Sequence, residues 1–373
     1  MYSMLHSQTD SAALHERIAA AVQNAGGWLP FDAYMHMALY EPALGYYAGE
    51  HPKFGAWAAQ GGDFTTAPEL SPLFARALAR QVADALRATG TDEVWELGAG
   101  TGALAAGVLD ELQQQGCAPR RYCIVEISAA LRARQQERLA GYSGVVWTDA
   151  LPAALHGVVI GNEVLDAMPV KLLARRGGVW HERGVALGVH GQFVWAERPT
   201  ALRPPLEPAG AHDYETELHC AAHAFVESVA QALARGRGAA FFLDYGFPER
   251  EYYHPQRSMG TLVCHCAQRT DDDPLVAAGT KDISAHLNFT GVALAAQEAG
   301  CAVLGYTSQA RFLLNCGIGA LMEAASLPER ITAMKLLAEH EMGELFKAIA
   351  FASPALAEWL PCGFAEGDRM HRL

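Results

Sequence analysis

Residues 94–102 read Val94-Trp95-Glu96-Leu97-Gly98-Ala99-Gly100-Thr101-Gly102, a short apolar run that ends in three alternate glycines. An alanine- and leucine-rich segment, residues 103–112, follows directly and has helical character. This order predicts a strand, a tight glycine turn and a helix N-terminus. Because backbone without side chains lets a nucleoside approach closely, we expect an α/β fold with a nucleoside-binding turn.

The glycine spacing fits two cofactors. Gly98, Gly100 and Ala103 also match the looser G-x-G-x-x-G/A pattern of dinucleotide enzymes. A dinucleotide would bring an anionic pyrophosphate to this turn, where the carboxylate of Glu96 would repel it. S-adenosyl-L-methionine has no phosphate and carries a sulfonium and an ammonium, which Glu96 would attract directly or through water. The charge therefore favours S-adenosyl-L-methionine, and a nicotinamide oxidoreductase is the alternative.

Two further acidic residues follow predicted strands. Residues 121–127 form an apolar, β-branched run with Glu126 near its end. A carboxylate there can accept hydrogen bonds from both ribose hydroxyls. Asp149 follows a third strand candidate at residues 144–148 and could accept the exocyclic amine of adenine. It is equally typical of a turn or a helix cap.

Composition limits the class of protein. The chain has 373 residues, 51% of them hydrophobic, which suffices for two domains or one domain with large additions. Its formal net charge of −13 argues against nucleic acid as a partner. No apolar stretch has the length of a membrane span, so we expect no membrane insertion. The start resembles no signal peptide, and we expect a cytoplasmic protein.

The cysteines do not indicate a metal site. Eight cysteines occur without a C-x-x-C pair, and reduced thiols are expected. Cys264, His265 and Cys266 are adjacent, but neighbouring residues on an extended segment point to opposite faces. His219 and His223 lie four residues apart in a predicted helix without a third ligand nearby. We therefore predict no metal.

Five segments follow from the pattern along the chain. Residues 72–89 have helical periodicity, residues 93 to about 173 alternate strand and helix, and residues 179–195 read as a hairpin. A helix is expected at residues 217–235, and the last strand candidate is residues 302–306. The segments are an N-terminal helical cap and lid (1–90), the first part of the cofactor-binding core (91–178), an inserted substrate-side region (179–236), the rest of the core (237–320) and a C-terminal helical segment (321–373).

A fourth strand candidate, residues 157–160, ends in Gly161-Asn162-Glu163. Ligands of doubly wound sheets bind beyond the C-terminal ends of the strands. We therefore expect Asn162, Glu163 and Asp166 to face the reactive end of the cofactor.

With these segments in view, the chain resembles the MidA-like family of class I S-adenosylmethionine-dependent methyltransferases, whose mitochondrial members assist assembly of respiratory complex I. The similarity runs from about residue 18 to residue 317. It rests on blocks in the same order: Gly62-Asp63-Phe64-Thr65-Thr66-Ala67-Pro68-Glu69-Leu70-Ser71, the glycine turn, Val125-Glu126-Ile127-Ser128, Asn162-Glu163-Val164-Leu165-Asp166-Ala167-Met168-Pro169, Asp244-Tyr245-Gly246-Phe247, Glu251-Tyr252-Tyr253-His254-Pro255, Gly260-Thr261-Leu262, Asp273-Pro274-Leu275 and Asp282-Ile283-Ser284-Ala285-His286.

This resemblance implies a Rossmann-like, doubly wound sheet of seven strands and methylation of arginine in a partner protein. Two positions depart from the family pattern: Lys281, where glutamine is expected, and Gln268, where a histidine is expected before Arg269. If these positions touch the substrate, the methyl acceptor differs.

Methylation of a guanidinium needs carboxylates that hold its charge and leave one nitrogen able to attack. Glu163 is the first candidate, Asp166 the second, and Asn162 would orient the methionine end or the nucleophile. A helix-capping turn is the structural alternative for Asn162 and Asp166.

The block at residues 62–71 would close over the cofactor with Thr65 and Pro68, and Thr66 and Glu69 have the spacing of a capping box. Asp282, His286 and Tyr245 are candidates on the substrate side. Two other functions stay open: a methyltransferase for a small molecule, and an assembly factor that binds the cofactor with little or no turnover.

Overall fold

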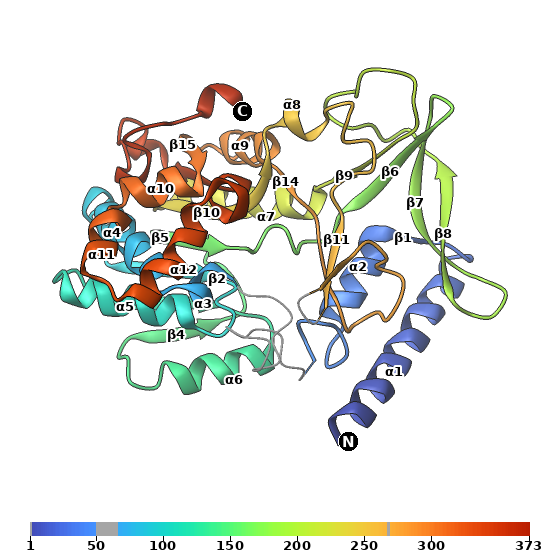
Figure 1. The fold of residues 1–373 in the computed structure, drawn as a ribbon, viewed down its shortest axis with the longest axis horizontal. Helices are drawn as coiled ribbons and strands as arrows, with labels where there is room; N and C mark the ends of the chain where they lie inside the picture. Colours follow the sequence, from blue (N-terminus) through green and yellow to red (C-terminus); the bar gives the residue numbers. More distant parts are fainter. Residues whose placement is uncertain (1, 50–65, 267–268) are drawn as a thin grey trace. The chain divides into compact units, whose positions relative to one another are not determined.

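The computed structural model describes residues 2–49, 66–266 and 269–373 (Figure 1). The chain groups into two compact units. The core unit lies within Thr65–Val164, His223–Gly246 and Phe289–Leu373. The accessory unit lies within Met1–Phe64, Leu165–Ala222 and Phe247–Asn288. Each unit is thus assembled from three separate stretches of sequence.

A mostly parallel sheet forms the centre of the core unit, in the order β15-β16-β10-β5-β2-β3-β4. The pairs β4–β3, β3–β2, β2–β5 and β5–β10 are parallel, while β16 is antiparallel to both β10 and β15. The predicted α/β fold with seven strands in this path is confirmed. The strands are β2 (Glu93–Leu97), β3 (Arg121–Val125), β4 (Val145–Thr148), β5 (His156–Asn162), β10 (Arg237–Phe247), β15 (Ala302–Ser308) and β16 (Phe346–Ala352).

The strand order reverses between β2 and β5. In open α/β sheets, ligands bind at such a reversal, beyond the C-terminal ends of the parallel strands. The C-terminal ends of β2, β3, β4, β5 and β10 share one edge because these strands are parallel. The edge therefore gathers the residues that follow each of these strands.

The helices of the core unit begin and end at clear signals. In α4, Ser71 is the N-cap, Pro72 opens the helix, and Gly90 ends it in the left-handed region at φ 65°. The predicted range 72–89 is confirmed. The helices are α3 (Ala67–Leu70), α4 (Pro72–Thr89), α5 (Ala103–Gln114), α6 (Ala129–Arg138), α7 (Cys220–Arg235), α9 (Phe289–Glu298), α10 (Gln309–Asn315), α11 (Ile318–Ala324) and α12 (Leu327–Leu337).

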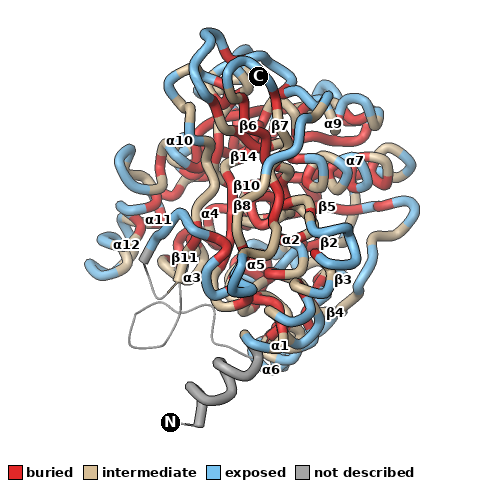
Figure 2. The backbone as a smooth tube through the Cα atoms, turned by 90° about the vertical axis from the view of Figure 1, so that its right-hand side faces the viewer, coloured by how far each residue is buried: buried red, intermediate tan, exposed pale blue. Residues whose placement is uncertain are grey.

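The hydrophobic core of this unit lies between α4 and α5 and one face of the sheet. Alternate strand residues point into it, among them Val158 and Ile160 of β5 and Phe241 and Leu243 of β10, all essentially buried. Figure 2 shows β5 and β10 in the red of buried residues. Such burial stabilises by roughly 1.5–3 kcal/mol for each large apolar side chain.

The structure corrects two predicted elements. The C-terminal segment 321–373 is not wholly helical, because β16 (Phe346–Ala352) lies inside the sheet and pairs with β10 and β15. Residues 302–306 are therefore not the last strand. The predicted helix at 217–235 begins at Cys220, since Tyr214–Leu218 forms β9. In β16, strand pairing overrides alanines that favour helix, and in β9, pairing with β6 holds residues 217 and 218 in the sheet.

The accessory unit packs helices α1 and α2 on a small sheet of order β1-β7-β6-β9, with β8 paired to β7. The predicted hairpin is confirmed as β7 and β8. Residues 263–266, 269–271 and 282–284 form a second small sheet of order β12-β11-β13. The elements are α1 (Tyr2–Asn24), β1 (Leu29–Pro30), α2 (Phe31–Tyr40), β6 (Lys171–Arg176), β7 (Val179–Leu187), β8 (Phe193–Pro199), β9 (Tyr214–Leu218), α8 (Glu249–Tyr252), β11 (Val263–Cys266), β12 (Arg269–Asp271), β13 (Asp282–Ser284) and β14 (Leu287–Asn288).

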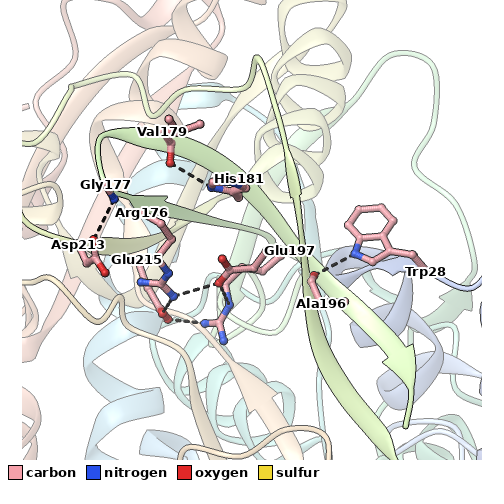
Figure 3. A network of polar contacts seen from close by, with 10 residues as sticks. Trp28, Arg176, Gly177, Val179, His181, Ala196, Glu197, Asp213 and Glu215 are labelled. Carbon is pink, nitrogen blue, oxygen red and sulfur yellow. Dashed lines mark hydrogen bonds and ion pairs between the residues drawn. The ribbon is translucent and has the colours of Figure 1, made fainter. Parts of the chain in front are cut away.

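An ion-pair network crosses the small sheet (Figure 3). Arg176 of β6 pairs with Glu197 of β8 at 3.0 Å and with Glu215 of β9, and Arg183 of β7 contacts both acids. Nearby, the Trp28 indole N–H donates to the Ala196 carbonyl at 2.9 Å. All four charged side chains retain some exposure, so each pair contributes at most about 1 kcal/mol. The network therefore adds little to the stability of the unit. Its main effect is to favour the observed pairing of β6, β7, β8 and β9.

Short helical turns complete the C-terminal region: η2 (Glu339–Gly343), η3 (Pro354–Leu356), η4 (Cys362–Phe364) and η5 (Met370–Arg372). In the described part of the chain, no helix has both the length and the apolar character to cross a membrane. The five segments expected from the sequence stay a prediction. The two compact units of the structure have different limits along the chain.

Candidate functional site

The glycine turn after β2 has the backbone that its sequence predicts. Gly98, Gly100 and Gly102 lie in the left-handed region, at φ 64°, 53° and 82°. A side chain at any of them would be strained, and a Cβ at Gly98 would lie 3.1 Å from the Val164 side chain. Gly102 is the N-cap of α5. The turn therefore offers bare backbone and a helix N-terminus to a ligand.

Glu96 lies just before this turn and is only 1% exposed. Its carboxylate accepts a 2.6 Å hydrogen bond from the hydroxyl of Tyr122 in β3. Burial raises the pKa of Glu96 to about 7, although the Tyr122 hydrogen bond works in the opposite direction, and the negative charge of Glu126 adds to the rise. A buried acid with this pKa would gain from a nearby positive charge.

Glu126 follows β3 and is 5% exposed. Its carboxylate accepts from the backbone N–H of Ser128 at 2.8 Å and from the side-chain amide of Gln135 at 2.9 Å. Burial raises the pKa of Glu126 above its usual value, and these two hydrogen bonds oppose the rise. Glu126, the predicted ribose acceptor, is thus fixed in place by two hydrogen bonds and partly removed from solvent.

Gln135 in α6 was not found from the sequence. It is fully buried and contacts three segments of the edge. Its amide donates to the Gly100 carbonyl at 2.9 Å as well as to Glu126, and its oxygen accepts from the Trp147 indole at 3.0 Å. No local pattern marks such a residue, because its partners are distant in sequence.

Helix α3, which contains Pro68, is held against the glycine turn. The carboxylate of Glu69 accepts from the Thr101 hydroxyl and, at 3.1 Å, from Arg138. Thr66 is the N-cap of α3 but makes no side-chain capping bond, so the expected capping box with Glu69 is wrong. Glu69 instead binds the turn, which the spacing alone did not reveal. Thr65 lies outside the described residues.

Glu163 follows β5 and has an unusual backbone. Its φ is 53°, in the left-handed region that a non-glycine residue rarely adopts. The carboxylate accepts from the Asn162 side-chain amide at 2.8 Å and from the Ala67 backbone N–H at 3.3 Å. Strained backbone of this kind costs about 1–3 kcal/mol and is frequent at functional sites. It holds the Glu163 side chain at the C-terminal edge of the sheet.

Asn162 presents an unpaired acceptor at the same edge. Its side-chain oxygen is buried and has no hydrogen-bond partner among the described residues. Leaving a buried amide oxygen unpaired costs about 1–3 kcal/mol, so the position favours a ligand with a donor group.

Asp244 near the end of β10 is a second residue that sequence reasoning did not select. It is 1% exposed and accepts from the backbone N–H groups of Val164 at 3.2 Å and Tyr245 at 2.9 Å. It thereby holds the turn after Glu163. Tyr245 itself packs its ring against Phe346 at 5.3 Å.

Asp149 follows β4 and is exposed. No polar contact ties its side chain to the turn in the described structure, and its role at adenine stays a prediction.

Three predicted residues lie in the accessory unit: Asp166, Asp282 and His286. The Asp282 carboxylate, 4% exposed, accepts from the Tyr47 hydroxyl at 2.8 Å. Burial raises the pKa of Tyr47 well above its usual value, and the charges of Asp282 and Asp166 add to the rise. The unit thus places both carboxylates near one phenol.

The third of these residues, His286, lies against a different aromatic side chain. Its ring is 5.4 Å from that of Phe247. No group of three or more His, Cys, Asp or Glu side chains that could hold a metal occurs among the described residues.

The residues at the core edge fit S-adenosyl-L-methionine. The positive charges of its ammonium and sulfonium match the buried acid Glu96, and its ammonium could donate to the Asn162 side-chain oxygen, which has no partner among the described residues. A pyrophosphate has no donor for that oxygen and would be repelled by Glu96. The geometry and charge of the edge therefore agree with the cofactor expected from the sequence.

The comparisons with known proteins point the same way. A family model described as S-adenosyl-L-methionine-dependent methyltransferase matches residues 77–307. The chain is similar to the mitochondrial protein arginine methyltransferase NDUFAF7 of Danio rerio, with 27% identity over 333 residues, 80% of this chain and 75% of the relative. With the human protein of that name, identity is 30% over 321 residues, 76% of this chain and 69% of the relative.

Solved structures agree over almost the whole chain. A crystal structure from Burkholderia thailandensis, bound to S-adenosyl-homocysteine, has 48% identity and a TM-score of 0.94, covering 99% of this chain and 98% of that chain. A native structure from the same organism has 47% identity and a TM-score of 0.89 with the same coverage. The predicted cofactor is confirmed. The chain belongs to the MidA-like family of S-adenosyl-L-methionine-dependent methyltransferases.

Proposed function

We propose that this methyltransferase transfers a methyl group to an arginine side chain of a partner protein. The relatives named protein arginine methyltransferase support the acceptor, since they align over about three quarters of this chain. The net charge of −13 also favours a cationic acceptor over an anionic one, because the field of the whole protein attracts it.

In this proposal the core edge holds the cofactor. Glu96 faces its positive end, Glu126 accepts from the ribose hydroxyls, and the left-handed glycines let the backbone approach. Asp149 would contact adenine, and Pro68 with Thr65 would cover the site. S-adenosyl-L-methionine supplies an activated methyl group together with its own leaving group. The chain therefore has to position the nucleophile about 3–3.5 Å from the methyl carbon and exclude water.

The Glu163 carboxylate is the observation on which the acceptor assignment rests. Asn162 and the Ala67 N–H hold one oxygen of Glu163 and fix its direction. A carboxylate fixed in this way can bind two N–H groups of a guanidinium and keep its charge away from the attacking nitrogen. The same carboxylate can accept the proton that the nitrogen loses after transfer.

Asp166 and Asp282 remain candidates for contact with the acceptor in this proposal. The Tyr47 hydroxyl holds Asp282, so this carboxylate presents a defined face to a cationic side chain. Asp166, His286 and Tyr245 keep their predicted substrate-side or catalytic roles as part of this proposal. The cytoplasmic location likewise stays a prediction.

A labelling experiment tests the acceptor. Lysate from a strain that lacks the protein is incubated with the purified enzyme and methyl-labelled S-adenosyl-L-methionine. We expect a labelled protein band whose digest contains methylarginine. Label confined to the low-mass fraction would show a small-molecule methyltransferase. Absence of label despite cofactor binding would indicate the assembly factor with little turnover.

The Glu163→Gln variant separates chemistry from binding. The variant keeps the shape of the side chain but removes its negative charge. General-base and charge effects of this kind change the rate by about 10²–10⁴-fold. We expect kcat to fall on that scale while the Kd for S-adenosyl-homocysteine stays within about threefold. The matched control is Glu137→Gln on the exposed face of α6. A wild-type rate in Glu163→Gln would remove Glu163 from the mechanism.

A further inference from the structure

We propose that Gln135 is the positioning residue of the cofactor edge, which holds the Glu126 carboxylate in the direction that receives the ribose. The inference rests on the proposed function, because it assumes that Glu126 binds the ribose. Gln135 is fully buried in α6, and no motif of the sequence pointed to it.

The direction of the Gln135 amide follows from its three partners. The Trp147 indole N–H can only donate, so the amide oxygen must face it, at 3.0 Å. The amide NH₂ then faces two acceptors, the Gly100 carbonyl and a Glu126 carboxylate oxygen, each at 2.9 Å. Reversal of the amide would place oxygen against oxygen at two contacts. The three hydrogen bonds therefore allow only one orientation of the Gln135 amide.

Gln135 joins three segments that are separate in sequence. Gly100 belongs to the turn after β2, Glu126 follows β3, and Trp147 lies in β4. These segments carry the predicted contacts to the methionine end, the ribose and the adenine. A single side chain thus fixes the spacing of all three.

The hydrogen bond from Gln135 also affects the ionisation of the Glu126 carboxylate. Glu126 is 5% exposed, and burial opposes its ionised form. The Gln135 amide is one of the donors that lower the pKa of Glu126 and so oppose the effect of burial. A carboxylate offers about four acceptor sites, and the protein donors occupy only part of them. The remaining sites are available to the two ribose hydroxyls.

Gln135→Met tests the role, because methionine has similar length and no donor. The matched control is Gln136→Met, the same change at the next residue of α6, where the side chain is exposed. Titration calorimetry with S-adenosyl-homocysteine should give a Kd about tenfold higher for Gln135→Met and unchanged for the control. The loss should be larger at pH 6 than at pH 8, since Glu126 without the amide takes up a proton more readily. An unchanged Kd, or a loss equal at both pH values, would overturn the proposal.

A double-mutant cycle separates positioning from general packing. In the Glu126→Ala background, Gln135→Met should raise the Kd by no more than about twofold, because the residue it positions is gone. A full tenfold loss in that background would show that Gln135 acts through packing alone and would overturn the proposal. If Glu126→Ala by itself leaves the Kd unchanged, the ribose assignment fails instead, and this outcome is distinct from the others.

A second variant keeps the test available if Gln135→Met does not fold. Trp147→Phe removes the donor that orients the amide oxygen but leaves Gln135 in place. We expect a Kd for S-adenosyl-homocysteine about threefold higher, and no further loss when Trp147→Phe is combined with Glu126→Ala. An unchanged Kd in folded Trp147→Phe would contradict the orienting network.

Discussion

The hydroxyl of Tyr122 donates a 2.6 Å hydrogen bond to the carboxylate of Glu96, and both side chains are buried beside the glycine turn. Burial raises the pKa of Glu96 to about 7, whereas the hydrogen bond limits the rise. Glu96 therefore changes its charge within the pH range in which enzymes are usually assayed. Cofactor affinity and folding stability should both report this charge.

Cofactor affinity should fall as the pH falls through 7. The cationic cofactor favours ionised Glu96, and below pH 7 binding must first remove a proton from it. From pH 8 to pH 6 we expect the Kd for S-adenosyl-L-methionine to rise by about tenfold. Calorimetry in buffers of different ionisation enthalpy should detect proton release. Glu96→Gln should bind more weakly at pH 8 and lose this dependence, and a dependence retained in Glu96→Gln would assign it to another group.

The same carboxylate should destabilise the free enzyme at high pH. Because its folded pKa is raised, its favourable contribution is present below about pH 4.5 and is lost as the pH rises through 7. At pH 8 the buried charge costs about 3 kcal/mol. We expect Glu96→Gln to raise the Tm at pH 8 and to change it much less at pH 4.5. Scanning calorimetry at both pH values checks this, with exposed Glu137→Gln as the control, and equal shifts at the two pH values would contradict it.

Local signals in the sequence were sufficient for part of this site. The glycine turn and α4 were predicted with their bounds because glycine, serine and proline act within a few residues of one another. Glu96 and Glu126 were found because they follow apolar runs. The cofactor followed from the charge of Glu96.

The remainder depends on contacts between distant segments. Gln135 and Asp244 matter through partners that folding brings to them, and the left-handed backbone of Glu163 has no signature in its residue type. Likewise, β16 is a strand because β10 and β15 flank it, although its alanines favour helix. Such features follow from tertiary packing, which no short pattern contains.

Replacement of Glu126 should weaken cofactor binding directly. Hydrogen bonds to a charged acceptor contribute about 1.5–3 kcal/mol, so Glu126→Ala should raise the Kd for S-adenosyl-homocysteine by tenfold or more. The exposed Glu137→Ala provides the control on the following helix. Calorimetric titration measures both variants. Equal affinities would remove Glu126 from the cofactor site.

The backbone of Glu163 makes a prediction that does not depend on catalysis. At φ 53° an alanine is strained and a glycine is not, so Glu163→Gly should be more stable than Glu163→Ala by about 1 kcal/mol. At Glu137, inside helix α6, the same pair should reverse, since glycine costs about 1 kcal/mol relative to alanine there. Urea denaturation of the four variants gives both differences. If glycine were the less stable residue at both positions, the left-handed conformation of Glu163 would not exist in solution, and the carboxylate would lack the fixed direction that methyl transfer to a guanidinium requires.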